Sequence, residues 1–181
     1  MTATDGTGLK QASGSELLSL YTHQHNMADS NLAVERDITV KNFMAFGTVL
    51  LLQTGFFATH LKPHVIIAVC GLVIMSIALA ARAMIIFYGK YSSRLFALAS
   101  IYRKAYLRGR DGLYIIDRVD RLQDSGRLPD AEHLSLKEYF THWGALATIN
   151  TIPAIIGAIL TIVGAAIWHT DVNPWDLMVA R

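Results

Sequence analysis

Residues 143–168 read WGALATINTIPAIIGAILTIVGAAIW and contain no charged side chain. A helix rises about 1.5 Å per residue, so this stretch reaches roughly 37 Å, enough to cross a hydrocarbon layer of ~30 Å. Trp143 and Trp168 would then lie near the two water–lipid interfaces, where an apolar ring with one polar N–H is favoured. The stretch therefore predicts a transmembrane helix.

Two further apolar runs precede it. They are NFMAFGTVLLLQTGFFAT at 42–59 and VIIAVCGLVIMSIALAA at 65–81, and the second ends at Arg82. We expect Arg82 to lie near the far interface, where a long side chain reaches the headgroups. Three such runs in 181 residues favour a membrane protein over soluble core helices. The first begins too far into the chain for a cleaved signal peptide.

The basic residues predict the orientation. The net charge is only +2, but ten of the sixteen Lys and Arg residues fall between Lys90 and Lys137. The positive-inside rule places residues 90–142 in the cytoplasm. The amino terminus is then also cytoplasmic, and the turn at 60–64 and the carboxyl terminus are outside. The predicted location is the bacterial inner (plasma) membrane.

The predicted fold is an all-α integral membrane protein with three transmembrane helices and a cytoplasmic helical segment between the second and third. Ser13 with Glu16, and Ser135 with Glu138, have the spacing of capping boxes that start helices. In chain order the predicted parts are a flexible tail (1–14), a cytoplasmic N-terminal helix (15–41), a transmembrane hairpin (42–90), a cytoplasmic basic helical segment (91–134), a third transmembrane helix (135–169) and an outer tail (170–181).

One side of the third span carries small and polar residues. Such a face lets helix backbones approach closely, within the chain or between subunits. Alternatively it lines a permeation path, together with Thr151 and with Gln53 of the first span. Proline would loosen the helix there. The residues of this packing or pore face are Asn150, Pro153, Gly157, Thr161 and Gly164, with Gln53 opposite.

A basic stripe follows the second span. Beside the inner leaflet, such a stripe attracts anionic headgroups. Next to tyrosines it would also suit a nucleotide or another anionic ligand. The predicted contacts are Arg103, Lys104, Arg108 and Arg110.

No catalytic set, cofactor or metal centre is predicted. We find no nucleophile beside a base and an orienting group, so the chain is not expected to be an enzyme. Cys70 is the only cysteine and is read as a packed thiol. His60, His64 and His169 would meet at the outer surface as metal ligands only if the turn at Pro63 allowed it.

The layout resembles the SLATT families, small bacterial membrane proteins found with nucleotide-signalling conflict systems. The similarity covers residues 15 to about 124 and lies in ERDITVKNF (35–43), the hairpin that follows, and SIYRKAYLRGRDGLYIIDRVD (100–120), with Arg36, Asn42, Tyr102 and Arg103. It implies a pore-forming or membrane-perturbing effector in antiviral defence. The third span departs from the two-helix pattern.

The predicted function is a non-enzymatic membrane effector that acts as a homo-oligomer and is switched through its cytoplasmic helices. Its partners would be the lipid bilayer and further copies of itself. The alternative is an accessory subunit of a larger membrane complex, with Tyr139, Trp143, Trp168 and Trp175 as its docking surface.

Overall fold

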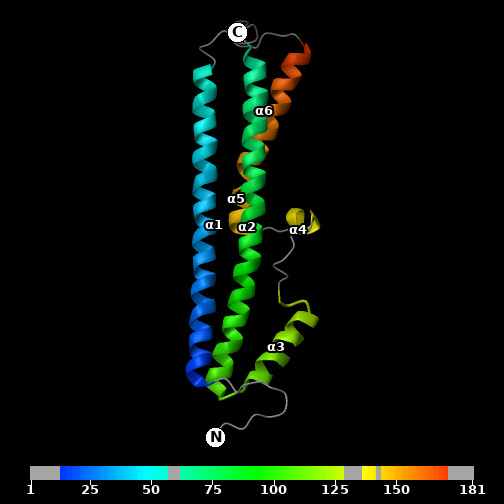
Figure 1. The fold of residues 1–181 in the computed structure, drawn as a ribbon. Coiled ribbons are helices and arrows are strands. Elements are labelled where there is room, and N and C mark those ends of the chain that lie inside the picture. Colours follow the sequence, from blue (N-terminus) through cyan, green and yellow to red (C-terminus); the bar gives the residue numbers. More distant parts are fainter. Residues whose placement is uncertain (1–12, 57–61, 129–135, 142–143, 171–181) are drawn as a thin grey trace. The chain divides into compact units, whose positions relative to one another are not determined.

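The computed structural model describes residues 13–56, 62–128, 136–141 and 144–170, and every element within them is an α-helix (Figure 1). By their contacts, the described residues form two compact units. The basic unit holds residues 13–34 and 87–128, and the apolar unit holds 35–56, 62–86, 136–141 and 144–170. In chain order the helices are α1 (Gly14–Phe56), α2 (Pro63–Arg108), α3 (Gly112–Asp124), α4 (Leu136–Thr141), α5 (Ala145–Ile149) and α6 (Thr151–Thr170).

The first two helices are longer than the predicted parts. α1 has 43 residues and α2 has 46, and each contributes to both units. The predicted boundaries at 41/42 and 90/91 therefore fall inside continuous helices. The physical reason is that no proline lies between residues 14 and 56 or between 64 and 108. Once nucleated, a helix gains one hydrogen bond for each further residue that it fixes.

Local signals fix the helix ends of the basic unit. Ser13 N–H donates to Glu16 Oε2 at 2.7 Å and Glu16 N–H to Ser13 Oγ at 3.3 Å, which confirms the first capping box. α2 ends at Arg108 and is followed by Gly109, whose φ of 58° is accessible to glycine at little cost. Arg110 N–H then donates to Ala105 O at 2.9 Å and closes the helix.

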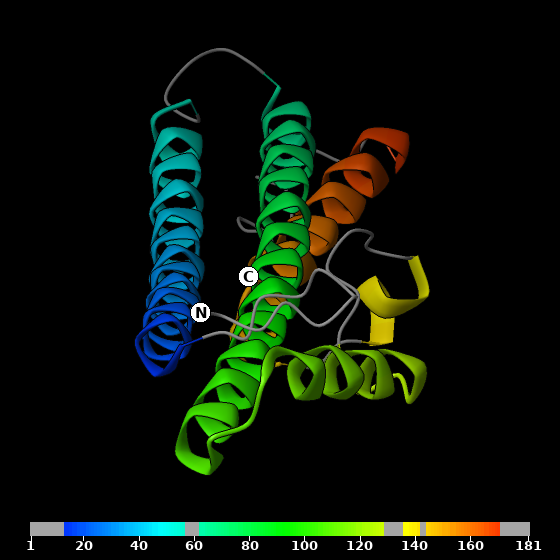
Figure 2. The same ribbon diagram turned by 60° about the horizontal axis from the view of Figure 1, so that its bottom comes forward.

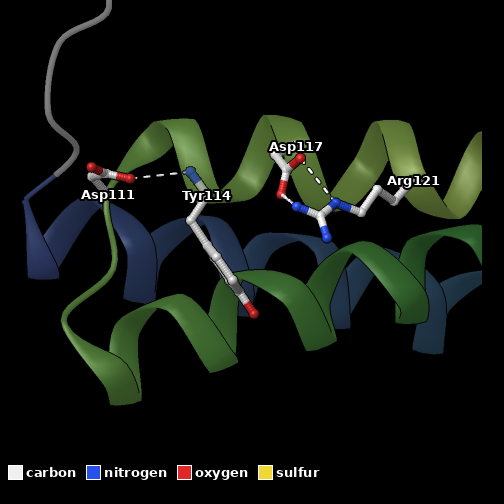
Figure 3. A network of polar contacts seen from close by, with 4 residues as sticks. All are labelled: Asp111, Tyr114, Asp117 and Arg121. Atoms are coloured by element: carbon white, nitrogen blue, oxygen red, sulfur yellow. Dashed lines mark hydrogen bonds and ion pairs between the residues drawn. The ribbon is translucent and has the colours of Figure 1, made fainter.

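α3 is capped by Asp111, whose Oδ1 accepts from Tyr114 N–H at 3.1 Å (Figure 3). Asp117 and Arg121 form an ion pair one turn apart, with Nη2 and Oδ2 separated by 2.6 Å. None of the residues of α3 is buried. Its cap and this ion pair are local contacts, and the side chains of Ile115, Val119 and Leu122 are half-buried.

Small residues bring α1 and α2 together in the basic unit. Ala28 is fully buried, and its carbonyl accepts a hydrogen bond of 3.0 Å from the buried Ser92 hydroxyl. Other apolar residues of the basic unit are also buried. They are Leu17, Leu95, Ala99, Ile101 and Ala105.

In the apolar unit, α6 runs obliquely across α2 with backbone against backbone (Figures 1 and 2). A Cβ built on Gly157 would lie 2.6 Å from Met75 N and 2.7 Å from Gly71 O. A Cβ on Gly164 would lie 2.6 Å from Ala68 N. Atoms cannot approach that closely, so only glycine allows this crossing.

Two of the helices are long and apolar enough to cross a membrane, namely α2 and the stretch Ala145–His169. α1 does not meet the same criterion. Its predicted span at 42–59 is helical up to Phe56, and residues 57–59 lie outside the described part of the chain.

The predicted third transmembrane helix at 135–169 corresponds to several helical segments in the described residues. They are α4, α5 and α6, and a one-residue turn at Asn150 separates α5 from α6 within the apolar stretch Ala145–His169. Pro153 is the physical reason for the turn, because it has no N–H to donate to the carbonyl of Ile149. The second capping box begins at Ser135, and the first tryptophan is Trp143; both residues lie outside the described ranges.

The glycine crossing gives a direct test. Gly157→Ala should lower the free energy of unfolding by about 2 kcal/mol, because the new methyl group overlaps the α2 backbone. Gly47→Ala is the matched control, because a Cβ there meets nothing within 4 Å. The control should leave stability unchanged or raise it by up to about 1 kcal/mol. Reversible unfolding in mixed detergent micelles, followed by circular dichroism, measures both. Equal stability of the two variants would contradict the crossing.

Candidate functional site

The apolar unit buries polar side chains on several of its helices. Asn42 on α1, Arg82 on α2 and Asn150 between α5 and α6 are each at most 5% exposed. Burying such groups is costly unless each is hydrogen-bonded. We call the cluster that they form the polar layer, and its members are Thr39, Asn42, Arg82, Tyr139, Asn150 and Thr151.

Arg82 is the charged centre of the polar layer. Its guanidinium donates from Nη1 to Ala147 O at 3.1 Å and from Nη2 to Tyr139 O at 3.0 Å. Nη1 also donates to the Thr151 hydroxyl. The Tyr139 ring lies beneath the guanidinium, with its centroid 5.4 Å from Cζ.

The expectation that Arg82 reaches outward to headgroups was therefore wrong. Its side chain is 5% exposed and turns toward the ends of two short helices. The last four carbonyls of a helix lack partners within it and carry partial negative charge. Tyr139 O in α4 and Ala147 O in α5 are two such carbonyls, so this position suits a cation.

Tyr139 makes a second hydrogen bond to α2, in addition to the one that its carbonyl accepts from Arg82. Its hydroxyl donates to Leu79 O at 3.1 Å, and its backbone carbonyl accepts from Arg82. Leu79 precedes Arg82 by one turn of α2. The tyrosine thus connects α4 to α2 through its ring, its hydroxyl and its carbonyl.

Asn150 links the turn between α5 and α6 to α1. Its Nδ2 donates to Leu146 O at 2.8 Å and to Thr39 Oγ1 at 3.0 Å. Its Oδ1 accepts from Asn42 Nδ2 at 2.6 Å. Thr39 and Asn42 are three residues apart, so they share one face of α1. Asn150 is fully buried, and both the oxygen and the nitrogen of its side-chain amide are therefore hydrogen-bonded.

Glu35 lies one turn before Thr39 on α1. Its side chain is 6% exposed, and its Oε1 has no hydrogen-bond partner among the described residues. Burial raises the pKa of this carboxyl above its ordinary value, and the charge of Arg36 opposes that shift. The buried position therefore favours the neutral acid.

The other residues of the predicted packing or pore face lie against α2 in the same chain. Gly157 and Gly164 contact its backbone, and the Thr161 hydroxyl lies 3.5 Å from Ala68 O. Pro153 is fully buried. Gln53 is also buried, but on α1 and outside the polar layer, and its Oε1 has no hydrogen-bond partner in the described chain.

The four predicted cationic contacts lie in the last turns of α2 and directly after it, in the basic unit. Arg103 and Lys104 line a hollow in the basic unit. Arg108 is the last residue of α2, and the Arg110 guanidinium lies 5.5 Å from the centroid of the Tyr114 ring.

The three histidines considered as possible metal ligands are not all in the described part of the chain. His60 lies outside the described residues, and within those residues no group of three or more His, Cys, Asp or Glu side chains is placed to hold a metal ion.

Comparison with known proteins adds no relative. No protein-family model matches the chain, and neither a curated protein nor a solved structure matches it significantly.

The charged centre of the polar layer can be tested by substitution. Arg82→Gln should lower the free energy of unfolding by about 3 kcal/mol, because buried carbonyls lose a charged donor. The stability of Arg82→Lys should fall between that of the unmodified protein and that of Arg82→Gln. Lysine keeps the charge, but its ammonium lacks the planar fork of the guanidinium. Arg118→Gln on exposed α3 is the control, with a change within about 0.5 kcal/mol. Chemical unfolding in micelles measures all three, and an Arg82→Gln protein as stable as the control would refute the assignment.

The Asn42–Asn150 bond can be tested by a double-mutant cycle. Asn42→Leu or Asn150→Leu alone leaves a buried amide without its partner, at a cost of about 1–3 kcal/mol each. The double variant should be more stable than the sum of the single changes predicts, by about 1 kcal/mol. Additive free energies of unfolding would mean that the two side chains do not interact.

Proposed function

We propose that this chain is a multi-pass protein of the bacterial inner membrane that acts, without enzymatic chemistry, as a pore-forming or membrane-perturbing effector. The proposal includes three spans, with the third formed by α5 and α6 and the first by the apolar half of α1. The amino terminus and the basic unit would be cytoplasmic, and the carboxyl terminus outside.

The main support for this proposal is that many large apolar side chains are exposed on the surface of the chain. Within the most apolar windows of α2 and of Ala145–His169, only 33% and 22% of the residues are buried. The core helix of a soluble protein is mostly buried. Here the large apolar side chains of α6 face away from the chain, and they include Ile152, Ile155, Ile159, Ile162 and Trp168. Lipid is the solvent that suits this surface.

The proposal includes self-association, but not through the face that was predicted as a seam. The small-residue face of α6 is occupied by α2 of the same chain, so it is not available as a subunit seam. Three helices of one chain enclose no water-filled path, so a pore would need several copies. α1 is the least apolar of the three proposed spans, and we assign the lining of such a path to it.

Switching through the cytoplasmic helices is supported by chain connectivity. α1 and α2 each extend without a break from the basic unit into the apolar unit. A change in how these helices pack in the basic unit therefore has a direct covalent route to the polar layer. The polar layer would then set which helix arrangement is stable in the membrane.

Efflux measurements test the effector function. Purified protein in proteoliposomes should release a trapped small dye, with a rate that rises more steeply than linearly with protein per vesicle, because several copies must meet. Heat-denatured protein at the same dose is the control. Unchanged dye retention at every protein density would refute the effector proposal. Co-purification with a fixed second protein from native membranes, without efflux, would favour the accessory subunit instead.

A further inference from the structure

A hollow of about 370 Å³ opens between α1 and α2 in the basic unit. α1 contributes two of its lining residues and α2 contributes six. Its volume lies in the range of small-molecule sites, roughly 300–1,000 Å³. The lining residues are Tyr21, His25, Phe96, Ala99, Ser100, Arg103, Lys104 and Leu107.

Three rings build one wall of this hollow. Tyr21 and His25 stack with centroids 5.6 Å apart, and Phe96 meets His25 edge to face at 5.5 Å. Rings that contact one another in this way hold their positions without a ligand. The wall is therefore a ready surface for a flat or apolar group.

α2 contributes positive charge to this hollow. Between Phe87 and Arg108, α2 carries five Lys and Arg residues and no Asp or Glu. Arg103 and Lys104 lie at the hollow, and no ion pair within the described ranges occupies either of them. Asp29 is the carboxylate beside the wall, with its Oδ2 3.8 Å from His25 Nε2. The hollow therefore combines two cations with an aromatic wall.

We propose that this hollow binds a small phosphorylated molecule with an apolar or aromatic body. Arg103 and Lys104 would take the phosphate, and the Ser100 hydroxyl would donate to it. Arginine suits phosphate because its planar fork matches two oxygens at once. Phe96 and Leu107 would contact the body of the ligand.

A phosphate group here would come either from a soluble molecule or from a lipid headgroup. Arg103 follows Lys90 by thirteen residues, which is about 20 Å along an α-helix. If the second span ends near Lys90, where the predicted transmembrane hairpin (42–90) ends, bilayer headgroups lie too far along α2 from Arg103. We therefore assign the site to a soluble ligand, and this choice of source rests on the proposed function, whereas the site itself does not.

Phenyl phosphate is a suitable probe, because it combines one phosphate with one ring. Isothermal titration of the full-length protein in a zwitterionic detergent should detect its binding. Phenol should bind at least tenfold more weakly, because it lacks the phosphate. The variant Arg103→Gln/Lys104→Gln should weaken phenyl phosphate binding at least tenfold. Arg118→Gln/Arg127→Gln removes the same charge from exposed positions and should change binding less than twofold. Circular dichroism melting curves should show that both double variants remain folded.

Other results would overturn the proposal. Equal weakening by both double variants would mean diffuse charge attraction rather than a site. Binding to phosphatidylglycerol nanodiscs that needs Arg103 and Lys104, without binding of phenyl phosphate, would replace the soluble ligand by a headgroup. If the protein bound neither phenyl phosphate nor the nanodiscs, the proposed site would be refuted. None of these results depends on dye efflux, so the site and the effector function can fail separately.

Discussion

A guanidinium buried in an apolar helical unit constrains everything around it. The Arg82 guanidinium has five N–H donors and no acceptor, so the chain must bring acceptors to it. α4 and α5 supply them by ending where they do, with Tyr139 O and Ala147 O directed at the side chain. A single continuous helix would have used those carbonyls internally. The break in the third apolar segment thus provides the free carbonyls that allow Arg82 to be buried.

The glycine crossing and the polar layer depend on each other. Between Gly71 and Gly157 the backbones touch, which leaves no room for side chains between α2 and α6. Membrane helices lack a strong hydrophobic drive to associate, so close packing and interhelical hydrogen bonds hold them together. Packing along the glycines gives contact area but little fixed orientation. The bonds of Asn150 to α1, and of Arg82 to α4 and α5, supply the orientation.

Much of this arrangement is visible in the sequence, because hydropathy and capping act over short distances. The helical class, the apolar runs and the Ser13–Glu16 cap follow directly from residue patterns. The unbroken α1 and α2 could also have been inferred, because proline is absent from both. The direction of Arg82 could not, because an arginine at the end of an apolar run can reach headgroups or carbonyls equally well. Which of the two it reaches depends on where α4 ends. That is a feature of the tertiary structure, and the residues next to Arg82 in the sequence do not indicate it. Asn42 carried a readable signal, since it shares a helix face with Thr39 at the entry to an apolar run.

A ligand in the basic unit affects the polar layer only if it binds one packing of α1 and α2 more tightly than another. Each tenfold difference in affinity supplies about 1.4 kcal/mol to shift that equilibrium. One buried amide hydrogen bond, such as that between Asn42 and Asn150, is worth about the same amount. A phosphate site with modest selectivity could thus offset the loss of one contact in the polar layer, but not the several contacts of Arg82. In such a switch Arg82 would stay in place, and the bond between α1 and Asn150 would be the contact that changes.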